Sequence, residues 1–223
     1  MKRIWLIGNG VSLKTTPLYL LRDEVTMGCN KIGKLGIALT YYVKQDHARF
    51  DVDTPEEQIN PFIGKAKMLL WNAFRDGNPS QEINGMGDLP DTTWISRCDK
   101  HHYYGIEDFK AAQSWHLPEL CTAYNTISLM AQWAVLLGFD EIFLIGCDAD
   151  YTDGHSDHFD ENYYSKVDDD YARRNSRNVQ YAHHIMKRSC PIPIYDATVN
   201  GKLDIHPKVE IERILSYAFQ KES

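Results

Sequence analysis

The fold is decided by Ile4-Trp5-Leu6-Ile7-Gly8-Asn9-Gly10-Val11-Ser12-Leu13-Lys14, an apolar run that opens into a glycine-rich turn. Proteins of the α/β class prepare phosphate sites in this way, because glycine lets the backbone approach a ligand and the N–H groups of a following helix face negative charge. The spacing fits neither G-x-G-x-x-G nor the Walker pattern. The stretch predicts a nonstandard nucleotide site, and an ordinary tight strand-to-helix turn is the open alternative.

Further apolar runs also end on polar residues: Asn30 follows Val25–Cys29, Asp46 follows Leu39–Val43, and Asp148 follows Glu141–Gly146. The carboxyl ends of parallel strands meet at one edge of a sheet, where open α/β sheets bind their ligands. We therefore expect several strand ends to converge on one site. The residues predicted to hold a nucleotide and its phosphate are Gly8, Asn9, Gly10, Ser12, Asn30 and Asp46.

The rest of the chain follows the same α/β pattern. Further apolar runs lie at Thr93–Ser96 and Ile192–Tyr195, and helical spacing runs from Leu120 to Leu137 and again over Arg173–Lys187. Short apolar runs separated by helical segments are typical of a parallel sheet. We predict one Rossmann-like α/β domain over residues 1–223, with a mostly parallel sheet. A polar active-site loop or lid is expected at about residues 148–171.

Composition narrows the function classes. The chain has 223 residues, of which 43% are hydrophobic and 25% charged, with a formal net charge of −7. The acidic balance argues against an extended nucleic-acid surface, although Arg173–Arg177 could still line a local basic groove. Five scattered cysteines, no signal peptide and no apolar run of roughly 18 residues predict a reduced, cytoplasmic protein without a membrane span.

Asp148-Ala149-Asp150 has the Asp-x-Asp form that holds a divalent cation in many nucleotide-sugar transferases. In an extended segment, side chains two residues apart point the same way, so both carboxylates could share one Mg²⁺ or Mn²⁺ ion. An acidic start to the loop is the alternative interpretation. We expect no tightly bound cofactor.

The remaining candidate site residues are two histidines and an asparagine at the start of a predicted helix. His155 and His158 lie in the polar loop, where an imidazole near neutral pKa can serve as general acid or base. Phe159 should anchor His158, whereas a solvated position is favoured for His155. Asn125 lies at the start of the long helix, as a ligand contact or as its cap. The adjacent pair His183-His184 is expected on the surface.

Three segments resemble known families: Gly8–Lys14, the strand that ends Cys29-Asn30, and the helix–glycine–strand block from Leu136 to Asp148. They resemble the bacterial CMP-sialic-acid sialyltransferases and the related MptE-like family, named for the archaeal 6-hydroxymethylpterin diphosphokinase. His158-Phe159 and the segment Tyr195–Leu203 look more like the MptE-like group. The resemblance covers roughly residues 2–50 and 120–210.

The resemblance implies that Asn9, Gly10, Ser12 and Asn30 bind the nucleotide-activated donor and that Tyr151 contacts the leaving phosphate. The chain departs from the sialyltransferase pattern at the position of the catalytic base. The sialyltransferase base is a histidine shortly before the last helix, and the corresponding segment Asp170–Asn175 contains none. Either His158 or His155 takes over that role, or the reaction differs.

These observations favour a glycosyltransferase that uses a nucleotide-activated sugar, with a CMP-sugar preferred, to glycosylate an acceptor hydroxyl. His158, Asp148 and His155 are its predicted catalytic residues. The alternative is a Mg²⁺-dependent pyrophosphokinase of the MptE-like kind, with Asp148 and Asp150 as metal ligands. A non-catalytic nucleotide-binding module is a third hypothesis. The sequence does not identify the acceptor, and DNA or protein acceptors are compatible with it. A homo-oligomer is also compatible with the sequence.

Overall fold

A computed structural model describes residues 1–44, 67–71, 92–97, 115, 119–120, 125–150, 158–160 and 169–221. Four of the predictions made from the sequence lie outside these residues: those on Asp46, Tyr151 and His155, and most of the loop expected at 148–171. The side chains of residues 169–178, which include the basic cluster, are also outside the description.

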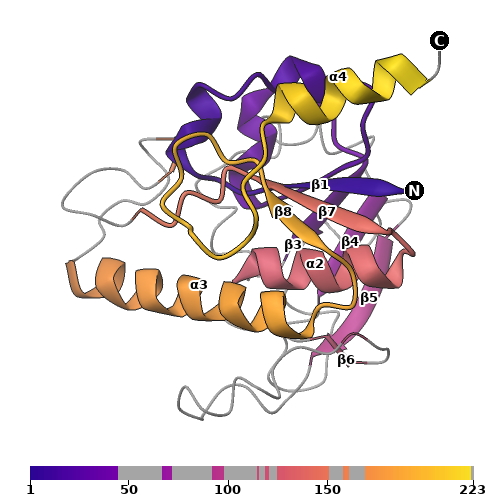
Figure 1. Cartoon of the computed structure of the whole chain (residues 1–223). Coiled ribbons are helices and arrows are strands. Elements are labelled where there is room, and N and C mark those ends of the chain that lie inside the picture. Colours follow the sequence, from indigo (N-terminus) through magenta and orange to yellow (C-terminus); the bar gives the residue numbers. More distant parts are fainter. Residues whose placement is uncertain are drawn as a thin grey trace.

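The described strands form one eight-stranded sheet in the order β6-β5-β4-β3-β2-β1-β7-β8, and every pair of neighbours is parallel. The arrangement confirms the α/β prediction (Figure 1). The strands are β1 (Arg3–Ile7), β2 (Thr26–Cys29), β3 (Tyr41–Lys44), β4 (Lys67–Trp71), β5 (Thr92–Arg97), β6 (Glu119–Leu120), β7 (Glu141–Ile145) and β8 (Ile194–Asp196).

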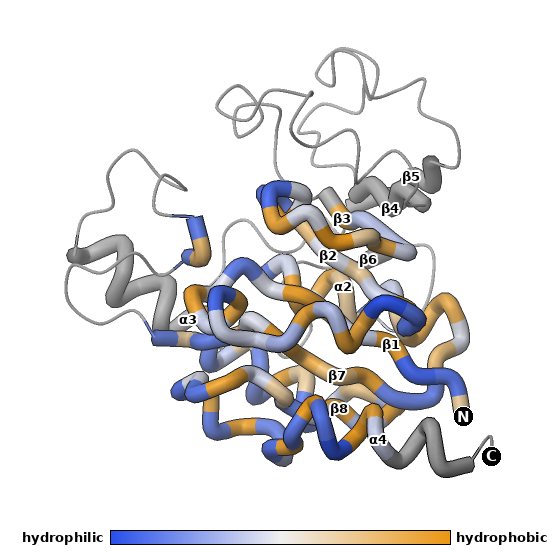
Figure 2. Tube along the Cα trace, turned by 90° about the horizontal axis from the view of Figure 1, so that it is seen from above, coloured by the Kyte–Doolittle hydropathy of each residue, from blue (hydrophilic) through white to orange (hydrophobic). Residues whose placement is uncertain are grey.

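Both faces of the central strands are covered, which explains their continuous apolar sequences. Alternate residues of β1 enter different cores: Ile4 and Leu6 pack on one face of the sheet, and Trp5 and Ile7 on the other. Strand β7 divides in the same way and is buried along nearly its whole length. In the hydropathy view, strand β7 is accordingly largely hydrophobic (Figure 2).

The first layer contains α2 (Thr126–Leu136) and α3 (Asp169–Ser189), which lie on the same side of the sheet (Figure 1). Helix α2 is buried around most of its circumference, as expected for a helix between a sheet and another helix. Gly138, with φ +77°, supplies the left-handed residue that follows its end. The predicted helices at 120–137 and 173–187 are thus confirmed, with shifted ends.

The opposite layer contains α4 (Ile211–Lys221) and three short 3₁₀ helices, η1 (Val11–Lys14), η2 (Leu18–Leu21) and η3 (Asn30–Leu35). The expected α-helix after the glycine-rich turn is therefore replaced by one turn of 3₁₀ helix. Thr15 and Thr16 direct their hydroxyls back to the carbonyl oxygen of Ser12, and Pro17 follows. Both features oppose continuation of a helix.

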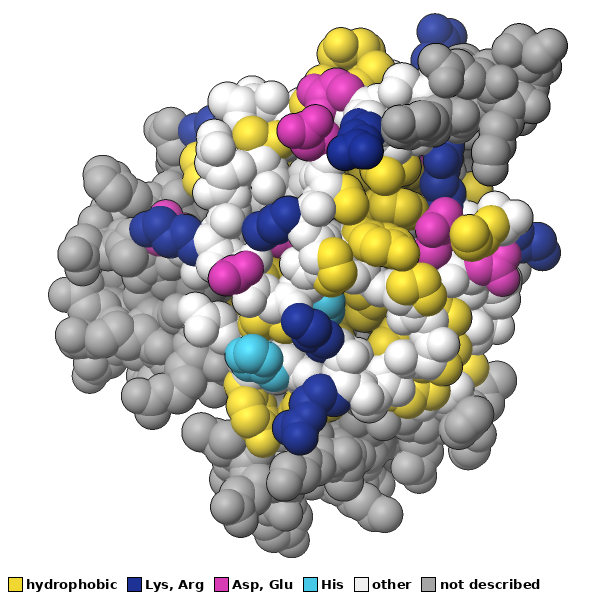
Figure 3. Space-filling model, in the orientation of Figure 1, with side chains coloured by type: hydrophobic (Ala, Val, Ile, Leu, Met, Phe, Trp, Pro, Cys, Tyr) yellow, Lys and Arg dark blue, Asp and Glu magenta, His cyan; other side chains and the backbone are white. Residues whose placement is uncertain are grey.

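On the face drawn in Figure 3, lysine and arginine side chains are scattered, with acidic side chains among them. None of the helices in the described part of the chain is long and apolar enough to cross a membrane.

Candidate functional site

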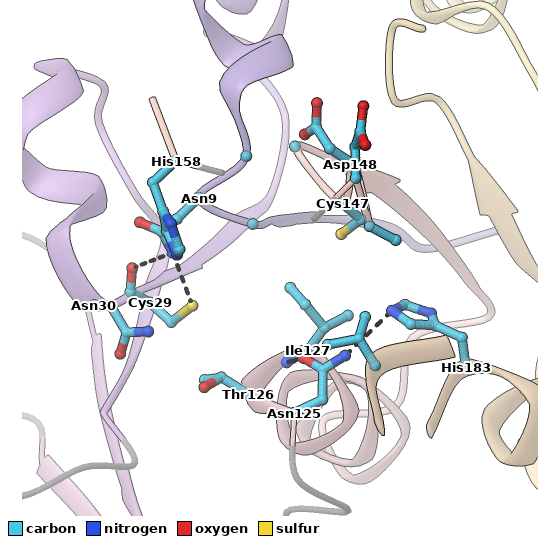
Figure 4. A pocket seen from close by; sticks show the side chains of 16 residues that line it. Asn9, Cys29, Asn30, Asn125, Thr126, Ile127, Cys147, Asp148, His158 and His183 are labelled. Carbon is cyan, nitrogen blue, oxygen red and sulfur yellow. Dashed lines mark hydrogen bonds between the residues drawn. The ribbon is translucent and has the colours of Figure 1, made fainter. Parts of the chain in front are cut away.

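A pocket lies where the strand order reverses. The chain runs from β1 through β2 toward β6, then returns to place β7 on the other side of β1. Such a switch point leaves a crevice at the carboxyl ends of the strands, and ligands of open α/β sheets bind there. The pocket is lined by Gly8, Asn9, Gly10, Cys29, Asn30, Asn125, Thr126, Ile127, Gly146, Cys147, Asp148, Ala149, Asp150, His158, Val179 and His183 (Figure 4).

One side of the pocket is formed where the ends of β1 and β7 press together. The N–H group of Gly8 donates to the Ile145 carbonyl at 2.8 Å, and that of Gly10 donates to the Gly146 carbonyl at 2.9 Å. A Cβ atom on Gly8 would lie 2.3 Å from the Gly146 oxygen. One on Gly10 would lie 1.7 Å from a carboxylate oxygen of Asp148. These two glycines are therefore required by a close approach within the protein itself.

Asp148 stabilises this junction through two hydrogen bonds from Ser12. Its Oδ1 accepts the backbone N–H of Ser12 at 3.0 Å, and its Oδ2 accepts the Ser12 hydroxyl at 2.8 Å. Burial raises the pKa of the Asp148 carboxyl, while the two hydrogen bonds from Ser12 act in the opposite direction. The carboxylate points away from the space between Asn9 and Asn125 (Figure 4). We call Gly8, Gly10, Ser12, Gly146 and Asp148 the strand-end clamp.

The geometry expected for a shared metal ion is not present at Asp148 and Asp150. Ala149 between them has φ +51°, so the segment is not extended. Asp148 is bound to Ser12, and Asp150 forms an ion pair with Lys202 at 2.9 Å. Among the described residues, no group of three or more histidine, cysteine or acidic side chains is arranged to hold a metal. The two carboxylates do not fit a divalent cation in this arrangement.

Amide side chains from the ends of β1 and β2 face the pocket. The Asn9 Nδ2 donates to the Cys29 carbonyl oxygen at 3.2 Å, whereas the buried Asn9 Oδ1 has no hydrogen-bond partner within the described structure. Asn30 takes the left-handed conformation, with φ +54°, and its carbonyl accepts the Tyr42 hydroxyl at 2.8 Å. The side chains of Asn9 and Asn30 therefore lie at the same edge of the pocket (Figure 4).

His158 lies against this edge and is held in place by its neighbour. The N–H group of Phe159 donates to the Asn9 carbonyl at 2.9 Å, and the Phe159 ring is buried in the core, which confirms that it anchors His158. Burial lowers the pKa of His158 to about 4, assisted by the charge of Lys31 and opposed by that of Asp160. The imidazole is neutral at pH 7 and can accept a hydrogen bond there.

The opposite side of the pocket holds a chain of three side chains. Asn125 caps α2, because its Oδ1 accepts the Ile127 N–H at 2.9 Å. Its Nδ2 lies 3.2 Å from Nε2 of His183, whose Nδ1 lies 3.1 Å from Nε2 of His206. Burial lowers the pKa of His183 to about 3 and that of His206 to about 4. We call Asn9, Asn30, Asn125 and His183 the amide–histidine set.

The structure brings most of the predicted residues together. Ser12 does not line the pocket, because it is turned toward Asp148. His183 corrects a prediction: it is buried, only its neighbour His184 being exposed. Helical spacing could have revealed it, since residues 179, 182, 183 and 186 share one helix face. The predicted residues that line the pocket are Gly8, Asn9, Gly10, Asn30, Asn125, Asp148, Asp150 and His158.

The described residues that line the pocket are mostly uncharged, apart from Asp148 and Asp150. None of its described lining residues is a lysine or an arginine. Asparagine amides and neutral imidazoles provide most of the hydrogen-bonding groups, and the two aspartates already have partners. Such a lining suits a ligand rich in hydrogen-bonding groups.

No protein-family model and no curated protein matches this sequence. Solved structures share the fold, among them two variants of one enzyme. An asparagine-to-alanine variant of the sialyltransferase CST-II, in complex with CMP, has a TM-score of 0.51 at 16% sequence identity, covering 93% of this chain and 86% of that chain. A tyrosine-to-phenylalanine variant of CST-II, also in complex with CMP, has a TM-score of 0.50 at 16% identity, with 92% and 85% coverage. The chain therefore shares its Rossmann-like α/β fold with these two structures.

Proposed function

We propose that this protein is a glycosyltransferase that binds a nucleotide-activated sugar, with a CMP-sugar preferred, and transfers the sugar to an acceptor hydroxyl. The observation that carries the proposal is the pocket at the β1–β7 switch point, where amide and imidazole groups from five segments converge. The fold shared with a sialyltransferase crystallised with CMP supports the same choice.

The charge of the pocket favours a CMP-sugar over a triphosphate. A CMP-sugar carries a single negative charge on its phosphodiester, whereas ATP carries several charges close together. Several phosphate charges need lysine, arginine or metal ions to screen them. The described lining offers neither lysine nor arginine, and Asp148 and Asp150 do not fit a cation. The pyrophosphokinase hypothesis therefore has less support than the transferase.

We assign the donor contacts to the amide groups. Asn9 and Asn30 are the proposed nucleotide contacts, and the unpartnered Asn9 Oδ1 would accept an N–H or O–H group of the ligand. Gly10, Ser12 and Asp148 would act indirectly, by holding the backbone that carries Asn9. His158 remains the proposed base: its ring is neutral at pH 7 and would take the proton of the acceptor hydroxyl despite a pKa lowered to about 4.

Calorimetric titration with CMP, UDP, ADP and ATP tests the donor class, both with magnesium and with a chelator present. We expect CMP to bind most tightly and chelation to leave its affinity unchanged. A CMP-sugar should then be consumed in the presence of acceptor, and His158→Gln should abolish turnover while CMP still binds. Tighter binding of ATP that requires magnesium would overturn the proposal in favour of the pyrophosphokinase.

The same titration separates the enzyme from a binding module. If CMP binds but no CMP-sugar is hydrolysed or transferred to any hydroxyl compound, the chain is a nucleotide-binding module. If none of the four nucleotides, nor their sugar derivatives, binds or shifts the melting temperature, the donor assignment fails altogether.

A further inference from the structure

The hydrogen bonds around Asn125 have only one consistent direction. The Asn125 Oδ1 accepts the Ile127 N–H group at 2.9 Å. The amide nitrogen Nδ2 therefore faces His183 and lies 3.2 Å from its Nε2. An amide nitrogen donates and does not accept. Nε2 of His183 must therefore be the acceptor and carry no proton.

The direction continues into the second histidine. A neutral His183 without a proton on Nε2 carries it on Nδ1, and this N–H group lies 3.1 Å from Nε2 of His206. That nitrogen must accept in turn, which puts the proton of a neutral His206 on its own Nδ1. One backbone N–H group at the start of α2 thus sets the proton positions of two imidazole rings.

We propose that His183 and His206 are positioning residues of the pocket, which hold the Asn125 carboxamide with one N–H group available to a hydrogen-bond acceptor of the ligand. The amide nitrogen has two hydrogens, and His183 receives one of them. Asn125 lines the pocket, so the second hydrogen serves a carbonyl oxygen, ring nitrogen or phosphate oxygen. This inference rests on the proposed function only where it concerns the ligand.

The surroundings of the two rings preserve the neutral state that this arrangement needs. Both imidazoles are buried, with exposed fractions of 1% for His183 and 3% for His206. The charged and titratable groups that act on them are His184 and Lys187 from α3 and Lys208 from the segment before α4. All of them oppose a further positive charge. A proton added to Nε2 of His183 would bring two donors face to face.

Nitrogen-15 NMR of histidine-labelled protein tests the proton positions without any ligand. At pH 7 we expect His183 and His206 to be neutral, each protonated on Nδ1. His206→Gln supplies an acceptor oxygen that cannot titrate, so it should preserve the His183 tautomer and the side-chain amide signals of Asn125. His206→Leu removes the acceptor and should shift or broaden those signals. His184→Gln, which changes the exposed neighbour, is the matched control and should leave them in place.

Binding of CMP supplies a second readout. We expect the dissociation constant to rise about tenfold in His206→Leu, as for loss of one well-placed hydrogen bond. It should change less than about twofold in His206→Gln and His184→Gln, which is within the scatter of surface substitutions. A His183 ring protonated on Nε2 at pH 7 would overturn the inference. So would unchanged Asn125 signals and CMP affinity in a folded His206→Leu protein.

The two proposals fail in distinguishable ways. If the wild-type protein does not bind CMP, the donor assignment fails, while the ring tautomers and the Asn125 signals still decide the positioning role. If His206→Leu does not fold, the wild-type tautomers and the preserved signals of His206→Gln decide it instead.

Discussion

The strand-end clamp and the amide–histidine set lie around the same pocket and use their polar groups in opposite ways. In the clamp, the Asp148 carboxylate and the Ser12 hydroxyl bond to each other, and the glycine N–H groups bond to the end of β7. In the amide–histidine set, the Asn9 Oδ1 has no partner among the described residues, and the Asn125 nitrogen has two hydrogens, of which His183 receives one. The clamp therefore builds the pocket, and the amides are left to recognise what enters it.

The largest expected effect comes from a methyl group inside the clamp. Gly8→Ala would place Cβ 2.3 Å from the Gly146 oxygen, a backbone atom that cannot move aside. We expect a loss of about 3 kcal/mol or more in the free energy of unfolding. Gly138→Ala is the control, because nothing lies within 4 Å of its added Cβ despite a φ of +77°. Denaturant unfolding should show a cost of only about 1 kcal/mol there. Equal costs would contradict the close approach.

Asp148→Ala should have the next largest effect. It leaves the buried Ser12 N–H and hydroxyl groups without their acceptor, so we expect a loss of about 2 kcal/mol. Asp150→Ala is the matched control, since the Asp150 ion pair with Lys202 is partly exposed and should contribute under about 1 kcal/mol. Thermal unfolding of both variants gives the comparison. A larger loss in Asp150→Ala would show that the stabilising carboxylate has been misassigned.

Asn30→Gly tests the amide–histidine set without disturbing the fold. Glycine accepts the φ of +54°, so stability should stay within about 0.5 kcal/mol of wild type. Removing the side chain should raise the dissociation constant of CMP about tenfold. Titration calorimetry measures the affinity. A large loss of stability with unchanged affinity would place Asn30 among the structural residues instead.

The smallest expected effect is on the pH dependence of stability. The pKa of His158 is lowered to about 4 in the folded protein, against 6.5 when unfolded. Between these values the unfolded chain binds more protons, so stability should fall as the pH drops below 6.5. His158→Gln should remove about 1 kcal/mol of the loss between pH 7.5 and pH 5.5. Denaturant unfolding at both pH values measures it, and identical profiles would mean that the folded ring titrates normally.

Much of the fold was predictable, because continuous apolar runs and parallel strand ends are visible in a sequence. The runs at β1, β2 and β7 are confirmed, as are the helices α2 and α3. Strand β4 was missed because a five-residue apolar run cannot be told from part of a helix. At the site, the glycine-rich turn predicted that another group would approach the backbone closely. The sequence could not show whether that group is a ligand or the end of β7.

His183 was missed for a different reason. The adjacency of His183 and His184 predicts a surface position for both. Only the helical phase set by Ala182 and Met186, both fully buried, separates His183 from His184. The link to His206 depends on a loop that no local pattern predicts.

That loop between β8 and α4 ties the C-terminal part of the chain to both halves of the site. The N–H group of Lys202 donates to the Asp148 carbonyl at 2.9 Å, and His206 lies against His183. The fully buried Asp196 anchors the loop through an ion pair with Lys208 at 2.6 Å. A protein cut between Asp196 and Ile211 would lose both supports in one step. Split or circularly permuted versions should therefore place their new ends elsewhere.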